Sequence, residues 1–366
     1  MQKLSVLFIF IFLLCLDRAL AQTPVGLFEG LLGNSGAALT DSSAPSYYNP
    51  SLLILKDQKS RSISGNTFSS FGSTNTNEKT SAISFYPTYL SSIFMSDSLA
   101  HEIFVINLTP TRLQNLRSVE EATYRENYEA TQDKNVVNGG YSMAFKSFPL
   151  ALSFFAQFTQ IKEFGFKDFT SLNSDLRNNS VNRGELSRLS SGFSVSGHTH
   201  FNAYTFGYNL KMRPVTLLSY NKLKTTSYIR GETAPADYRV SESESSVNYA
   251  DEDQTTILLG HSFRAGEHEF ITDTILTEKT VENRDYKISQ SFGYRLSDSS
   301  GHQFLTGLSH RIDRDIKYLG QDLYASVGYS WNNRANRTTF GLYYYRSDLI
   351  NKISAAGLTF GSEFNY

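Results

Sequence analysis

Hydrophobic and polar residues alternate along most of the chain from about residue 61 to its last residue. In segment 321–331, Leu323, Val327 and Trp331 share one face, while small and polar residues dominate the other. This two-residue period is that of a β-strand whose two faces meet different surroundings. Fourteen segments of this kind can be counted, near 61–72, 79–89, 100–108, 137–147, 149–160, 200–210, 214–226, 253–263, 268–278, 286–296, 302–312, 321–331, 338–347 and 353–366.

The connections between these segments are of two kinds that alternate along the chain. Short turns are predicted at five places, one of them Lys211 to Pro214, and long polar loops at 109–136, 161–199 and 227–252. The first loop suits a short helix over 118–128, and the third holds an acidic tract, which is either solvated surface or a cation-binding stretch. Residues 185–197 either belong to the second loop or extend the strand that follows.

Each alternating segment is about as long as a tilted transmembrane β-strand. Short turns at one end and long loops at the other are typical of outer-membrane barrels, where the long loops are extracellular. The last strand ends on Tyr366, and a terminal aromatic resembles the strand that the outer-membrane assembly machinery reads. Since only helices and closed barrels satisfy every backbone group in lipid, the sequence predicts an all-β, transmembrane antiparallel β-barrel of about fourteen strands.

The N-terminus predicts export. Lys3, a short hydrophobic run and the Ala19-Leu20-Ala21 site describe a signal peptide over residues 1–21, leaving a chain without cysteine. Residues 22–60 then form an N-terminal segment, and 61–366 form the barrel. The 34 basic and 35 acidic residues nearly cancel, which gives no reason to expect a nucleic-acid partner.

No constellation in the sequence indicates an enzyme. His198 and His200 have strand spacing, but no third ligand lies nearby, so no metal site is predicted, and no cofactor motif is present. Inward arginines such as Arg295, Arg311 and Arg346 would either tune the charge of a lumen or pair with acidic residues across strands. We therefore expect neither a catalytic site nor a cofactor.

The stretch 33–53, GNSGAALTDSSAPSYYNPSLL, differs from all of this. Its prolines exclude a strand inside a sheet, and a compact segment with a helical turn near 36–39 is expected instead. Asn34, the pair Tyr47-Tyr48 and the tract Asn49-Pro50-Ser51 resemble the N-terminal region of the FadL-type outer-membrane transporters, with Ser51 where that family has alanine.

This resemblance implies a fourteen-stranded barrel whose segment 22–60 is a plug inside the lumen. It also implies uptake of hydrophobic compounds such as long-chain fatty acids, released through a lateral opening after a plug movement. The expected partners are outer-membrane lipid and lipopolysaccharide, the hydrophobic ligand and the assembly machinery. Two alternatives stay open: a passive porin-like channel, or a barrel that anchors surface loops. Candidate residues lining the lumen are Phe155, Tyr324, Tyr343 and Tyr345.

Overall fold

The computed structural model describes residues 25–56, 59–72, 84–173, 177–230, 238–245, 255–278, 286–314, 319–333, 335–347 and 353–365. The expected signal peptide and Tyr366 lie outside these residues, as does the part of the acidic tract that follows residue 245. Three short helices come first: η1 (Gly30–Leu32), α2 (Pro45–Tyr48) and η2 (Pro50–Leu55). Within the described part of the chain, no helix is long and apolar enough to cross a membrane.

The remainder is antiparallel sheet, as the alternation predicts. The described residues form sixteen strands: β1 (Ser60–Gly72), β2 (Ser84–Met95), β3 (Leu99–Glu120), β4 (Tyr124–Phe145), β5 (Leu150–Ser171), β6 (Arg177–Phe201), β7 (Tyr204–Lys211), β8 (Val215–Arg230), β9 (Tyr238–Ser245), β10 (Thr256–Ala265), β11 (His268–Glu278), β12 (Tyr286–Ser297), β13 (His302–Arg314), β14 (Leu319–Asn332), β15 (Asn336–Ser347) and β16 (Ile353–Asn365).

Fourteen of these strands close into a barrel. The hydrogen-bonded order is β5-β4-β3-β2-β1-β16-β15-β14-β13-β12-β11-β10-β7-β6, and pairing of β5 with β6 completes the ring. Strands β8 and β9 continue the sheet outside the ring, with β8 paired to the upper part of β6. The transmembrane β-barrel and the number of strands in its ring are therefore confirmed.

The two faces of the barrel wall differ as the sequence pattern requires. On β5, Leu150, Phe154 and Phe158 point outward and are exposed, whereas Ala151 and Ser153 point inward and are buried. Ile103, Phe340 and Phe360 are likewise exposed on other strands. A water-soluble barrel would not expose so many large apolar side chains, but a barrel surrounded by lipid does.

Two of the expected loops are strands instead. Residues 109–136 belong to β3 and β4, which are joined by a short connection at 121–123, so the expected helix over 118–128 is absent. Residues 161–171 belong to β5 and residues 177–199 to β6. The expected loop at 227–252 includes the end of β8 and all of β9. These regions are rich in polar residues and alternate poorly, so only cross-strand pairing reveals them.

The predicted turn from Lys211 to Pro214 is also wrong. Both β7 and β8 run antiparallel to β6, so the chain keeps its direction through 212–214 and the ladder is merely interrupted there. The reversal lies before β7, at Asn202-Ala203, where Asn202 has a φ of 52°. The expected segments 200–210 and 214–226 therefore correspond to β7 and β8, which are one wall strand with a break, and no expected segment corresponds to β6.

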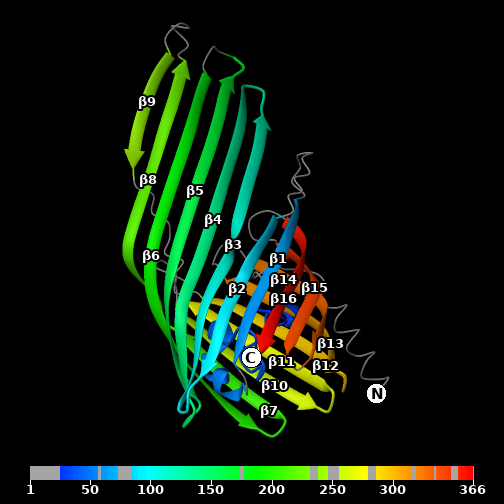
Figure 1. The fold of residues 1–366 in the computed structure, drawn as a ribbon. Helices are drawn as coiled ribbons and strands as arrows, with labels where there is room; N and C mark the ends of the chain where they lie inside the picture. Colours follow the sequence, from blue (N-terminus) through cyan, green and yellow to red (C-terminus); the bar gives the residue numbers. More distant parts are fainter. Residues whose placement is uncertain are drawn as a thin grey trace, which may run out of the picture.

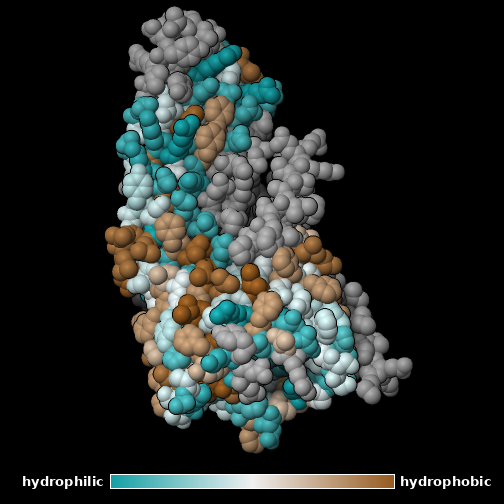
Figure 2. Space-filling model, viewed as in Figure 1, coloured by the Kyte–Doolittle hydropathy of each residue, from teal (hydrophilic) through white to brown (hydrophobic). Residues whose placement is uncertain are grey.

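Strands β3 to β6, with β8 and β9, extend well beyond the rest of the ring on one side of the molecule (Figure 1). We call this extension the wing. Strands β3 to β5 have 22 residues each, about twice the length needed to cross a membrane. Figure 2 shows the described part of the wing as mostly hydrophilic, with hydrophobic residues gathered where it meets the barrel.

Candidate functional site

Residues 25–56, hereafter the inner segment, fold back into the barrel, where Figure 1 shows them in blue behind the strands. Helix η1 contacts β12 to β15, and η2 contacts β3 to β6 on the other side. The hydrophobic residues Leu27, Phe28 and Leu31 are at most 1% exposed. A turn hydrogen bond from Leu39 N to Gly36 O lies where the helical turn was expected. The segment therefore packs as the core of the barrel.

Inward-facing glycines let the inner segment lie directly against the wall. A Cβ atom at Gly307 would overlap the backbone of Leu32 and Gly33, and one at Gly293 would lie 2.7 Å from Leu32 Cβ. A glycine inside a strand marks such a close approach of another backbone. The glycines that make contact in this way, hereafter the glycine belt, are Gly207, Gly260, Gly293, Gly307, Gly328, Gly341 and Gly361. They occupy β7, β10 and β12 to β16, so the segment fills this half of the barrel tightly.

Three buried carboxylates hold the inner segment by its backbone and hydroxyl groups. On β11, Asp273 accepts hydrogen bonds from Gly36 N and Ala37 N, at 2.7 and 2.9 Å. Glu102 on β3 accepts from Ser46 N at 2.9 Å, and Glu29 accepts within the segment from residues 42–44. Burying a carboxylate is costly unless such donors surround it, so each one fixes the local fold.

Asn49 joins the inner segment to β6. Its Nδ2 donates to the carbonyl oxygens of Ala37 and Gly197, at 2.8 and 3.1 Å, and its Oδ1 accepts from Ser51 N and Oγ. Pro50 begins η2, a position that needs no N–H donor. Ser51 Oγ also lies 3.0 Å from His198 Nδ1, which gives the serine at this position a partner on the wall.

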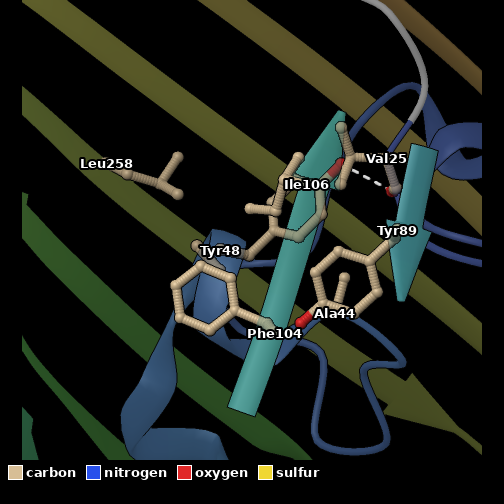
Figure 3. Close-up of a cluster of buried hydrophobic side chains, with 8 residues drawn as sticks. Val25, Ala44, Tyr48, Tyr89, Phe104, Ile106 and Leu258 are labelled. Carbon is tan, nitrogen blue, oxygen red and sulfur yellow. Dashed lines mark hydrogen bonds between the residues drawn. The ribbon is translucent and has the colours of Figure 1, made fainter. Parts of the chain in front are cut away.

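The two predicted tyrosines have different surroundings. Tyr48 is buried in a cluster that Figure 3 shows, and its hydroxyl donates to Val25 O at 3.2 Å. Its neighbour Tyr47 is half-buried and meets the ring of Tyr48 edge-on. The other members of the cluster that Figure 3 labels are Ala44, Tyr89, Phe104, Ile106 and Leu258.

A cavity of about 220 Å³ lies between Tyr47 and the wall. Its lining combines aromatic and aliphatic side chains with serine, threonine and amide groups, and Lys211 is the one ionisable residue other than a tyrosine among the residues that line it. The lining residues are Ser46, Tyr47, Phe104, Ile106, Asn138, Ser153, Phe155, Gln157, Ser194, Lys211, Met212, Pro214 and Thr256. We call this cavity the inner pocket.

The inner pocket adjoins the interruption between β7 and β8. Strand β10 pairs with β7 only as far as Lys211, and β9 pairs with β8 only from Leu223 onward. Residues 246–254, which link β9 to β10, lie outside the described structure. On β8, Val215, Leu217 and Leu218 are each more than half exposed.

The four expected lumen-lining residues lie in different places. Phe155 lines the inner pocket and packs against the cluster around Tyr48. Tyr324 and Tyr343 are buried and stacked on each other beneath η1, where the Tyr324 hydroxyl donates to Gly30 O. The backbone of Tyr345 belongs to β15, but its side chain lies outside the described structure. Asn34, from the motif, is buried with a φ of 63°.

A charged cluster fixes the inner segment near the short-turn end of the barrel. Asp41 lies between two wall arginines, 2.8 Å from Arg295 and 3.1 Å from Arg337. Arg295 also pairs with its cross-strand neighbour Glu269, one of the two roles expected for such arginines. Lys56 and Glu363 form a further ion pair at 2.5 Å. Sequence reasoning missed Asp41 and Arg337, because no local pattern reveals partners 296 residues apart.

Comparisons with known proteins are consistent with this architecture. No family model matches the sequence, and no curated protein matches it closely. Solved structures do match in fold. A CymD monoaromatic hydrocarbon channel superposes with a TM-score of 0.68 at 10% identity, over 95% of this chain and 99% of that one.

Two further barrels are similar over the same 95% of this chain. The Pseudomonas putida toluene transporter TodX gives a TM-score of 0.61 at 10% identity and is covered to 99%. A Pseudomonas aeruginosa FadL homologue gives 0.58 at 9% identity and is covered in full, to 100%. The predicted resemblance is thus confirmed at the level of the fold: this chain has the fold of the FadL-type barrels.

Proposed function

We propose that this protein lies in the outer membrane of a Gram-negative cell and passes hydrophobic small molecules across it. The observation that carries this proposal is the inner pocket, a cavity with an aromatic and aliphatic side and a polar side, which lies between Tyr47 and the interrupted wall after Lys211. Fold neighbours described as a monoaromatic hydrocarbon channel and a toluene transporter support it.

The arrangement of the inner segment restricts where a molecule can pass. The glycine belt brings the segment into contact with the backbone of β7, β10 and β12 to β16, which leaves no room on that half. The inner pocket lies on the other half, mainly against β3 to β6, and touches β7 and β10 only at their end residues Lys211 and Thr256. A ligand therefore follows the β3–β6 side of the lumen and reaches Tyr47 before it meets the charged cluster around Asp41.

The pocket favours small or slender ligands. Its volume of about 220 Å³ is below the ~300–1,000 Å³ of pockets that hold drug-sized molecules. A single aromatic ring or part of an alkyl chain suits this space. Fatty acids and monoaromatic hydrocarbons are the two substrate classes to be compared.

Release is proposed to occur sideways. A route straight through the barrel leads past Asp41, Arg295 and Arg337, whose charges disfavour an apolar molecule. The wall beside the inner pocket is interrupted at 212–214, and the side chains exposed just beyond this break, those of Val215, Leu217 and Leu218, are apolar. A shift of Tyr47 would open the pocket toward this edge, which makes the inner segment the gate.

The test compares uptake of radiolabelled oleate and toluene by cells with and without the protein. Gln157→Trp places a large ring in the inner pocket, and Gln160→Trp on the outward face of the same strand is the matched control. We expect Gln157→Trp to lower uptake several-fold while Gln160→Trp leaves it unchanged. Equal uptake with and without the protein would refute hydrophobic transport. Passage of small sugars at the rate of an open porin would instead support the passive channel.

A further inference from the structure

The outer face of the wall carries a second hollow, directly behind the inner pocket. It has a volume of about 490 Å³ and is almost entirely apolar. Three small residues form its floor, because Gly139, Ala156 and Ser191 are cross-strand neighbours on β4, β5 and β6. The next residue in this row is Val215, the first residue of β8. We call this hollow the outer trough.

Large side chains border the trough on both sides. One border is the row Tyr141, Phe154 and Phe193, which lies two residues along each strand from the floor. The other border lies on the opposite side of the floor and consists of Val137, Phe158, Leu189 and Leu218. The two borders lie four residues apart, which is about 13 Å of strand. After the width of the bordering side chains, this leaves room for about one alkyl chain or one aromatic ring. It runs across the strands and ends at Val215.

The trough and the inner pocket are separated only by the wall. Phe155 is among the residues lining both hollows. Its ring lies over Gly192, where a Cβ atom would come within 2.6 Å of Phe155 Cζ, so no side chain thickens the wall at this point. Met212 and Pro214 line the inner pocket, and the next residue, Val215, lines the trough. The chain over 212–215 thus passes from the lining of one hollow to the lining of the other.

We infer that the outer trough is a binding site for the transported molecule on the membrane-facing wall, occupied as the molecule leaves through the interruption after Lys211. This inference rests on the proposed function and names the next stage of the route. The trough takes an uncharged aromatic or alkyl group, because its lining includes no ionisable side chain except Tyr141, whose hydroxyl is already bonded to His101. A charged head group would find no partner there.

The trough can be filled without disturbing the core. Ala156 is exposed on the outward face, so Ala156→Phe points into the trough and not into the barrel. Thr272→Phe is the matched control, since Thr272 is also exposed and outward-facing, on β11, away from the trough. The readouts are cellular uptake of a diazirine-bearing alkylbenzene, its binding to the detergent-purified protein, and the residues that it labels on illumination.

We expect Ala156→Phe to reduce uptake at least threefold with unchanged binding in the inner pocket, and Thr272→Phe to change neither. The wild type should be labelled at Ser191 or Val215, and this labelling should fall when Gln157→Trp blocks the inner pocket. If the Ala156→Phe variant takes up the probe at the rate of the wild type, the inference is overturned and the proposed function still stands. Trough labelling that Gln157→Trp does not reduce would also overturn it, since the probe then enters from the membrane. If the wild type neither binds nor takes up the probe, the proposed function fails first, and the inference with it.

Discussion

Lys211 Nζ donates a hydrogen bond to the carbonyl oxygen of Tyr47 at 2.5 Å and lies 4.3 Å from the centre of the same tyrosine ring. The lysine is the last residue of β7, so this contact joins the inner segment to the wall at the residue where the β7 ladder stops. No carboxylate within the described structure is paired with Lys211. The side chain of Lys211 thus holds Tyr47, the proposed gate, beside the interruption at 212–214, the proposed exit.

Replacing Lys211 should loosen the gate. Lys211→Met keeps the length of the side chain but removes a charged hydrogen bond that contributes about 1.5–3 kcal/mol. We expect amide hydrogens in 45–55 to exchange roughly tenfold faster or more, as measured by mass spectrometry. Lys211→Arg, which can still donate to Tyr47 O, should exchange at a rate close to that of the wild type. Identical exchange in Lys211→Met and the wild type would show that the contact does not hold the segment.

The glycine belt should tolerate no side chain. In Gly307→Val, the new atoms overlap Leu32 and Gly33, so the inner segment must move away from β13. We expect a larger single-channel conductance in planar bilayers, because the displaced segment no longer fills that half of the lumen. Gly165→Val on β5 is the control, since a Cβ atom there lies 3.6 Å from its nearest neighbour. Unchanged conductance in Gly307→Val would mean that the segment does not block the lumen.

Asp41 should contribute moderately to holding the segment. Its side chain is 33% exposed, which weakens its attraction to Arg295 and Arg337 relative to a fully buried pair. In Asp41→Asn, Arg295 keeps Glu269, and Arg337 lies 3.9 Å from Glu363. We expect a loss of about 1–2 kcal/mol from the charge-assisted bonds, seen as faster protease cleavage within 25–56. A double-mutant cycle with Arg337→Gln should show coupling, whereas strict additivity would contradict a direct interaction.

Substitution of Asn49 should destabilise the inner segment much more than substitution of Ser51, although the two residues are only two positions apart. Asn49→Ala leaves the carbonyl oxygens of Ala37 and Gly197 without their donor, which costs about 2–4 kcal/mol in a buried site. Ser51→Ala removes only the hydroxyl contacts to Asn49 and His198, at about 0.5–1.5 kcal/mol. Hydrogen exchange over 36–56 measures both effects. Equal effects of the two substitutions would show that Asn49 does not determine the position of this turn.

Much of the barrel could be predicted from the sequence, because lipid outside and a packed lumen inside impose a period of two. Segments such as 286–296 and 302–312 became β12 and β13 with almost the expected bounds. Strand β6 was missed because its upper part is polar on both faces, so its side chains carry no periodic signal. The sequence at 212–214 predicts a turn where the structure has an interruption, because a proline is compatible with a broken ladder and with a reversal alike.

By itself the sequence determined the strand period, the barrel class and a non-strand N-terminal segment, since each depends on local alternation or on residues that a strand excludes. Only the tertiary structure decided where that segment lies and what it contacts. Asp41 meets Arg337, Asn49 meets Gly197 and Lys211 meets Tyr47 across separations of 148 to 296 residues. Such contacts follow from the register and closure of the barrel, which no short stretch of sequence specifies.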